Sequence, residues 1–96
     1  MNIDNIVFID HLPTLDLHGF TRDFAIIEIN QFIKDNLKMQ NEFIVIIHGK
    51  GSGIIRDACL KTLRKNKYVK DFKTWYTNDG CMVVQLNKKT LINLTK

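Results

Sequence analysis

The chain has 96 residues, of which 45% are hydrophobic and 25% are charged, and its formal net charge is +4 at pH 7. This length and composition are typical of one globular domain with its own hydrophobic core. No apolar stretch approaches the roughly 20 residues that a membrane-spanning helix needs. The first residues also lack the basic and long apolar segments of a signal peptide. We therefore expect a cytoplasmic protein with no membrane partner.

The two cysteines, Cys59 and Cys81, lie far apart in the sequence and form no Cys-x-x-Cys pair. This usage supports neither a disulfide framework nor a zinc site with thiolate ligands. Positive charge is distributed unevenly, because lysines and arginines cluster between residues 61 and 73 and again at residues 88–96. A basic surface attracts polyanions, whereas a lysine-rich helix is more often simply a solvated surface. Charge alone leaves both interpretations open.

The first residues form a lead whose apolar run at residues 6–9 predicts a short extra strand, which Pro13 soon interrupts. Residues 14–18 alternate between polar and apolar side chains and therefore predict a strand. Because Asp16 and His18 are two residues apart, they share one face of this strand.

Thr21 is a favourable N-cap, and apolar residues then recur at helical spacing as far as about residue 39. The continuous apolar run at residues 43–47 predicts a strand that is central in the sheet or covered on both faces. A glycine-rich loop leads from this strand into a second predicted helix over residues 54–66.

Residues 69–77 and 81–86 predict two further strands, which a hairpin turn at residues 78–80 joins. The order βαβαββ predicts an α/β fold in which a right-handed crossover links each parallel pair of strands.

The strands predicted at residues 14–18 and 43–47 are each followed by a helix, and each leads into a His-Gly pair, His18-Gly19 and His48-Gly49. If the two strands are parallel, their carboxyl ends share one edge of the sheet, which is where open α/β sheets bind ligands. Helix N-termini favour anions such as phosphate. The sequence therefore predicts an anion site that contains two imidazoles.

A carboxylate beside an imidazole can orient the ring and raise its basicity, so that Asp16 and His18 suit general acid–base catalysis. The same pair can bind a hard divalent cation such as Mg²⁺ or Mn²⁺. An isolated Asp-x-His is more often a histidine that merely hydrogen-bonds a loop carbonyl.

Residues 48–53 have the sequence HGKGSG. Alternate glycines let several backbone N–H groups face one anion. Lys50 and Arg56 add positive charge suited to phosphate, and Ser52 either caps the following helix or contacts the ligand. The residue order matches neither a Walker A loop nor the G-x-G-x-x-G fingerprint. Such a turn is often only a tight connection, but here both motifs place a histidine at the same edge and so predict one shared site.

Together, residues 15–19 (LDLHG) and residues 48–56 (HGKGSGIIR) resemble the paired signatures of the Smr (small MutS-related) domain family, in a stand-alone short form. The resemblance implies a two-layer α/β sandwich with a mixed four-stranded sheet and two helices. This fold is similar to the C-terminal domain of the third bacterial translation initiation factor. The extent of the resemblance divides the chain into a lead at residues 1–11, with a possible short extra strand, an Smr-like domain at residues 12–87 and a basic tail at residues 88–96.

The resemblance also implies an endonuclease that nicks DNA or cleaves RNA, with nucleic acid and the ribosome as partners, in DNA repair or in quality control of mRNA. Asp16 and His18 match the pair on which cleavage depends in the family, and residues 48–51 match the second signature. The chain departs from the family at residues 78–81, where only Gly80 matches a Gly-Gly-x-Gly stretch. The residues expected to act in catalysis are Asp16, His18 and His48, and those expected to bind phosphate or nucleic acid are Gly49, Lys50, Gly51, Ser52, Gly53 and Arg56.

In the resulting hypothesis, Asp16 orients His18 as the general base, and His48 is a second acid or base or stabilises developing charge. RNA cleavage through the 2′-hydroxyl needs no metal, whereas DNA nicking needs a water that a divalent ion activates. The main alternative is a non-catalytic module that binds nucleic acid or the ribosome. A third is a small-molecule phosphate or nucleotide site in the same crevice.

Overall fold

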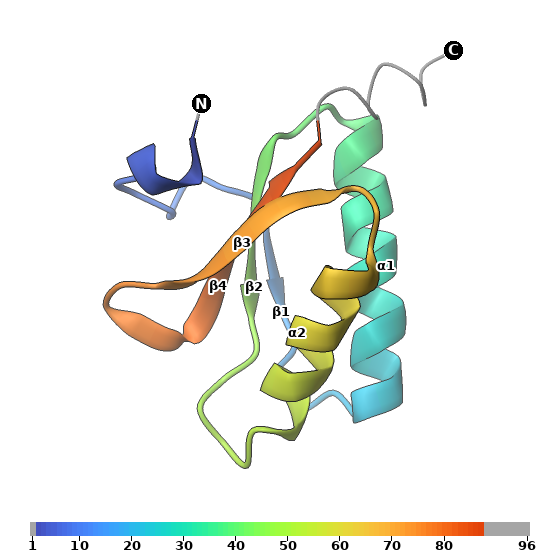
Figure 1. Ribbon diagram of the computed structural model, residues 1–96. Coiled ribbons are helices and arrows are strands. Elements are labelled where there is room, and N and C mark those ends of the chain that lie inside the picture. The colour runs from blue at the N-terminus through green and yellow to red at the C-terminus, as the bar shows by residue number, and fades with distance from the viewer. Residues whose placement is uncertain (1, 88–96) are drawn as a thin grey trace.

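The computed structural model describes residues 2–87, so the basic tail expected at residues 88–96 lies outside the described residues. The elements, in chain order, are a 3₁₀ turn η1 (Ile3–Asn5), β1 (Thr14–Asp16), α1 (Arg22–Lys38), β2 (Phe43–Ile47), α2 (Ile54–Lys65), β3 (Val69–Trp75) and β4 (Asn78–Leu86) (Figure 1). The strands form one four-stranded sheet with the order β1-β2-β4-β3. β1 is parallel to β2, and the other neighbouring pairs are antiparallel. The predicted mixed sheet with two helices is confirmed.

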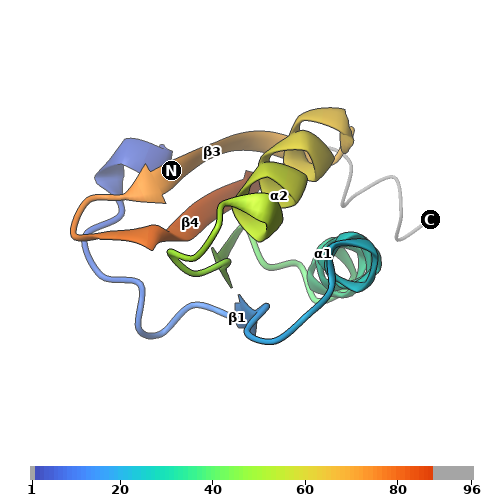
Figure 2. The same ribbon diagram turned by 90° about the horizontal axis from the view of Figure 1, so that it is seen from below.

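Both helices lie side by side on one face of the sheet, as the two views in Figures 1 and 2 show. The main core fills the space between these two layers. Its buried residues come from α1, α2, β2 and β4, together with Leu17, which directly follows β1: Leu17, Ala25, Ile29, Ile33, Leu37, Ile44, Ile46, Cys59, Leu63, Met82, Val84 and Leu86. No helix within residues 2–87 is long and apolar enough to cross a membrane.

The helix α1 forms where the sequence predicts it. The Thr21 hydroxyl accepts a hydrogen bond from the backbone N–H of Phe24 at 3.3 Å, which satisfies one of the free donors at the helix start. Buried side chains then recur every four residues from Ala25 to Leu37, on the face that covers the sheet. This helix therefore gains its stability from burial of one apolar face.

The N-terminal lead packs on the opposite face of the sheet (Figure 2). Ile3 and Ile6 are buried there against Phe43 and Val83. The short strand that we expected at residues 6–9 does not form, and this segment instead packs on the face of the sheet through Ile6. The outer face of β2 and β4 thus has its own small core.

The turn between β3 and β4 lies at Tyr76 and Thr77, so the prediction of a turn at residues 78–80 is wrong. Asn78 already pairs with Trp75, and regular pairing resumes only at Met82. The Asn78 side chain instead accepts a hydrogen bond from the backbone N–H of Gly80 at 3.0 Å, within the irregular start of β4. The same Asx-turn chemistry that is common in hairpin turns therefore shapes a bulge here.

If the lead contributes to stability through its outer core, truncation of Ile3, which is 2% exposed, must cost folding free energy. We expect Ile3→Ala to lower the free energy of unfolding by about 2 kcal/mol, as is usual for removal of a buried aliphatic side chain. Urea denaturation measures this change. Val7→Ala is the matched control, because Val7 is 70% exposed in the same segment, and an equal loss in both variants would contradict the packing described.

Candidate functional site

The parallel pairing of β1 and β2 brings the two His-Gly segments together. Asp16 is in register with Ile47, and the backbone N–H of Leu17 donates to the carbonyl of Ile47 at 2.9 Å. His18 and His48 each follow directly after these pairs, so both histidines leave the sheet at the same edge, as the sequence predicts. They line one groove of about 380 Å³, together with Asp16, Leu17, Gly19, Phe20, Ile47, Gly49, Lys50, Gly51 and Ile55.

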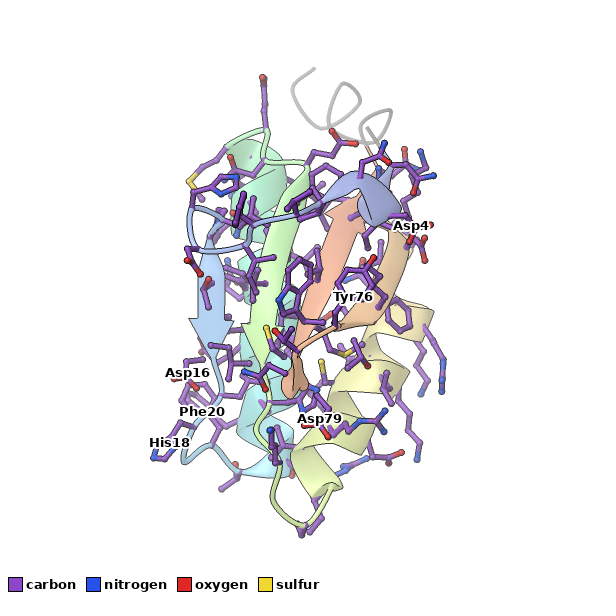
Figure 3. The ribbon with its side chains drawn as sticks, turned by 90° about the vertical axis from the view of Figure 1, so that its left-hand side faces the viewer. Asp4, Asp16, His18, Phe20, Tyr76 and Asp79 are labelled. Carbon is purple, nitrogen blue, oxygen red and sulfur yellow. The ribbon has the colours of Figure 1, made fainter. Side chains whose placement is uncertain are left out.

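Asp16 and His18 are exposed at the rim of this groove. Figure 3 shows their side chains close together just beyond β1, with the His18 ring directed outward. The Asp16 carboxylate accepts a hydrogen bond from the backbone N–H of His18 at 2.9 Å. This bond shapes the turn after β1, and within the described residues no hydrogen bond joins the carboxylate to the His18 ring. The orienting role assigned to Asp16 therefore stays a prediction.

His48 differs from His18 because it is only 8% exposed. Its Nδ1 lies 2.8 Å from the carbonyl oxygen of Gly49. A carbonyl oxygen can only accept, so Nδ1 carries the hydrogen, and Nε2 of the neutral ring presents a lone pair. This Nε2 is buried and has no hydrogen-bond partner among the described residues. Such an unsatisfied buried atom is uncommon in proteins and suits a group that meets its partner only when a ligand binds.

The neutral form of His48 is favoured. Burial is the largest influence and lowers the pKa of its imidazole, since a charged ring loses solvation there. The hydrogen bond to Gly49 and the charge of Asp79 raise this pKa, and the charge of Arg56 lowers it. The net result is a pKa below the usual value, so the lone pair on Nε2 is available near neutral pH.

The glycine-rich loop is fixed against the start of β4. The carbonyl of Gly80 accepts hydrogen bonds from the backbone N–H groups of His48 at 2.9 Å and Gly49 at 3.0 Å. A Cβ at Gly80 would lie 3.1 Å from the carbonyl carbon of Gly49 and 3.2 Å from Cγ of Lys50. This close approach favours glycine at position 80, because a larger residue would force the loop to shift by a few tenths of an ångström. The sequence pattern predicts a turn at Gly80, and only the match of this residue to the family pattern indicates its role beside the loop.

The expected phosphate-binding residues divide into two groups. Gly49, Lys50 and Gly51 line the groove, whereas Ser52, Gly53 and Arg56 do not. Lys50 Nζ lies 3.3 Å from Asp79 Oδ1 in an ion pair between exposed side chains, which contributes little stability and can be exchanged for another anion. Arg56 is exposed in the first turn of α2.

The suggestion that Ser52 caps α2 is wrong. The N-cap is Gly53, whose φ of +89° favours glycine, and no side chain caps this helix start. The first N–H groups of α2 are thus not satisfied by a capping side chain, and Ser52 stays exposed beside them.

The sequence predicts a divalent cation only as a cofactor that Asp16 and His18 would bind. Within residues 2–87, no three histidine, cysteine, aspartate or glutamate side chains gather closely enough to hold a metal ion. Asp16 and His18 are thus the two side chains that would hold a divalent ion at this rim. The cysteines are also outside the site, because Cys59 and Cys81 are buried and burial raises the pKa of both thiols, to about 12 for Cys59.

The fold and the groove define an α/β domain with two histidines and a glycine-rich loop at the carboxyl edge of parallel strands. The family model described as the Smr domain matches residues 15–87. The chain therefore belongs to the Smr domain family, as its paired motifs predict.

Curated relatives include proteins named endonuclease MutS2. The protein from Caldanaerobacter subterraneus subsp. tengcongensis is 36% identical over 80 residues, which cover 80% of this chain and 10% of that protein. The Staphylococcus aureus protein is 35% identical over 66 residues, 69% of this chain and 9% of that protein. The chain thus spans about a tenth of the length of these relatives.

Solved structures agree with the fold. The Smr domain of Thermus thermophilus MutS2 superposes with a TM-score of 0.77 at 29% identity, over 79% of this chain and 99% of that chain. YdaL, a stand-alone small MutS-related protein from Escherichia coli, superposes with a TM-score of 0.73 at 24% identity, over 78% of this chain and 64% of that chain. The second likeness shows the shared fold alone.

Gly80→Ala tests how tightly the loop is held. Its Cβ would press on the backbone of Gly49, so we expect the free energy of unfolding to fall by about 1–3 kcal/mol. Gly51→Ala is the control, because a Cβ there meets nothing within 4 Å and its φ is not positive. Chemical denaturation of both variants measures the difference, and a Gly80→Ala protein as stable as Gly51→Ala would show that the loop is not fastened in this way.

The burial of His48 also predicts a pH dependence of stability. Since its pKa in the folded state lies below the unfolded value of about 6.5, the unfolded chain binds the proton more readily as pH falls through that value. The contribution of neutral His48 to the free energy of unfolding is therefore complete above pH ~6.5, and it is lost as pH falls from there to the pKa of the folded state. We expect Tm to fall between pH ~7.5 and ~5.5, and to fall less in His48→Gln. His11→Gln, a change at an exposed histidine, should retain the wild-type dependence.

Proposed function

We propose that this domain is an endonuclease that cleaves the phosphodiester backbone of nucleic acid. The observation that carries the proposal is the convergence of Asp16, His18, His48 and the glycine-rich loop in one groove. Membership of the Smr domain family and homology to MutS2 proteins named endonucleases support the same activity. Because this chain spans only a tenth of those proteins, the activity is proposed for the domain on the basis of its own residues.

The loop at residues 49–51 provides the binding surface for the phosphate. Backbone N–H groups in a glycine-rich turn can converge on one anionic oxygen. Lys50 adds a mobile positive charge, and a phosphate can replace Asp79 as its partner. Arg56, in the first turn of α2, increases the positive potential near the groove.

The two histidines suit complementary roles in proton transfer. The Nε2 of His48 carries a lone pair in the favoured neutral ring and has no partner among the described residues. It fits the general base once substrate binding exposes this buried atom to the groove. His18 then donates the proton to the leaving oxygen from the exposed rim. This assignment reverses the expectation that His18 is the base, and burial of His48 is the reason.

RNA is the substrate that we favour, because it supplies its own nucleophile. The 2′-hydroxyl gives its proton to His48 and attacks the adjacent phosphorus, while the 5′-oxygen leaves with a proton from His18. The products are a 2′,3′-cyclic phosphate and a 5′-hydroxyl. This route needs only groups that line the groove. Action on DNA, a divalent cofactor, the ribosome as partner and a cytoplasmic location remain predictions from the family resemblance and the composition.

A binding module without catalysis is the alternative. One observation favours it: the Asp16 carboxylate bonds to the backbone N–H of His18 instead of to the imidazole. Under this alternative, Lys50 and the glycine-rich loop would still bind nucleic acid, and loss of the His18 ring would not change any reaction.

Cleavage assays with matched histidine variants separate these two functions. We expect His18→Ala to lower the cleavage rate of labelled single-stranded RNA by about 10²–10⁴-fold, the usual contribution of a general acid or base. Asp16→Asn should lower it less. His11→Ala, which removes an exposed histidine of the lead, should leave the rate unchanged.

The same assay is run on plasmid DNA, and with and without a chelator, to assign substrate and metal dependence. All variants are purified in parallel, so that a contaminating nuclease shows as activity that the substitutions do not change. Equal rates for wild type, His18→Ala and Asp16→Asn would exclude these residues from the chemistry and favour the binding module.

A further inference from the structure

A second groove, of about 300 Å³, follows the seam between α1 and α2. Three of its side chains are cationic and none is a carboxylate. Its lining residues, which we call the interhelical groove, are Arg22, Ile26, Asn30, Ala58, Lys61, Thr62, Lys65 and Asn66. Lys61 and Lys65 belong to the lysine-rich segment of the sequence, which does not line the candidate site.

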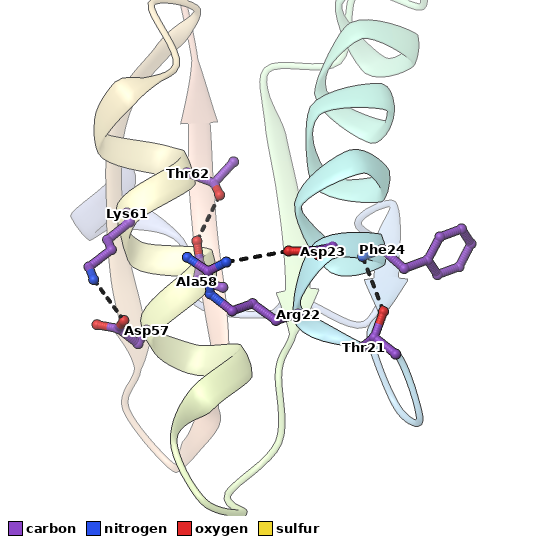
Figure 4. Close-up of polar contacts among 8 residues, drawn as sticks. All are labelled: Thr21, Arg22, Asp23, Phe24, Asp57, Ala58, Lys61 and Thr62. Carbon is purple, nitrogen blue, oxygen red and sulfur yellow. Dashed lines mark hydrogen bonds and ion pairs between the residues drawn. The ribbon is translucent and has the colours of Figure 1, made fainter.

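The interhelical groove begins where the candidate site ends. Phe20 and Ile55 line the candidate site, and Arg22 and Ala58 line the interhelical groove only two or three residues further along the chain. Both helices start at this edge of the sheet and run in the same direction (Figure 1). Figure 4 shows Arg22 extending from the first turn of α1 toward α2. A strand held at the glycine-rich loop can therefore continue along the seam.

The cations of the groove are available to a polyanion. Arg22 pairs with Asp23 at 3.3 Å and Lys61 pairs with Asp57 at 3.1 Å (Figure 4), and all four side chains are more than half exposed. Such exposed pairs contribute little stability, so phosphates can compete for both cations. Lys65 forms no ion pair within the part of the chain that the structure describes.

Amide groups close the far end of the groove. Asn66 Nδ2 donates to Asn30 Oδ1 at 3.1 Å and so links the two helices. Because this bond uses only the oxygen of the exposed Asn30 amide, its nitrogen can donate a hydrogen bond to a ligand in the groove. From Arg22 to Asn30, α1 rises by about 12 Å, which is long enough for more than one phosphate group.

We propose that the interhelical groove binds the phosphate backbone of the nucleic-acid strand beyond the cleavage point, and so adds a second binding region to the candidate site. The proposal rests on the proposed function for the identity of the strand. It follows that the protein binds a strand long enough to span both grooves more tightly than a strand that fills only the first.

The experiment compares two triple variants with the same change in charge. Arg22→Gln/Lys61→Gln/Lys65→Gln removes the cations of the groove. Lys34→Gln/Lys38→Gln/Arg64→Gln removes three exposed helical cations that do not line it. The probes are fluorescein-labelled 2′-O-methyl oligouridines of about 4 and about 16 nucleotides, which lack a free 2′-hydroxyl and cover the usual range of single-strand site sizes. Binding is measured by anisotropy at several salt concentrations, and thermal unfolding verifies that both variants fold.

We expect the groove variant to bind the longer probe about tenfold more weakly than wild type, with the slope of log K against log salt smaller by about 2. The shorter probe should bind all three proteins equally, and the control variant should bind the longer probe within about twofold of wild type. Equal weakening in both triple variants overturns the inference while wild-type cleavage of RNA still supports the proposed function. A wild-type protein that does not bind the probes and cleaves neither RNA nor plasmid DNA overturns both.

Discussion

The parallel pairing of β1 with β2 is the constraint on which the site depends. At the end of this pairing the backbone N–H of Leu17 donates to the carbonyl of Ile47 at 2.9 Å, and each strand then continues directly into a His-Gly turn. A shift in register by one residue would reverse the faces of Asp16 and Leu17, and would place Leu17 in solvent. Burial of Leu17 in the main core therefore fixes the position of the catalytic candidates, and stability and function share this one contact.

The start of β4 adds the second constraint. The Gly80 carbonyl accepts hydrogen bonds from the backbone N–H groups of both His48 and Gly49, so the glycine-rich loop turns away from β2 at a fixed point. This arrangement buries the His48 ring and leaves Nε2 without a partner among residues 2–87, which lowers the contribution of the loop to the free energy of unfolding. The two histidines thus differ in environment, one buried and one exposed, and this difference separates their proposed roles in proton transfer.

Local signals predicted much of the fold. The Thr21 cap, the four-residue repeat of α1 and the apolar run of β2 each depend on neighbouring residues, and the structure confirms them. The strand predicted at residues 6–9 and the turn predicted at residues 78–80 were wrong, because contacts between distant segments decide both. The convergence of His18 with His48 followed from strand order, whereas the Lys50–Asp79 pair and the burial of His48 depend on contacts between distant segments that spacing does not show.

If the two His-Gly turns form the binding site, one strand of nucleic acid must lie across both of them. Titration of ¹⁵N-labelled protein with a 2′-O-methyl oligouridine, followed by amide chemical shifts, measures this contact residue by residue. We expect the largest shifts at His18, at Gly19 and at the loop of residues 49–51, with a change in the His48 ring nitrogens. Shifts confined to the outer face of the sheet around Ile3 and Val83, with the histidine turns unchanged, would contradict it.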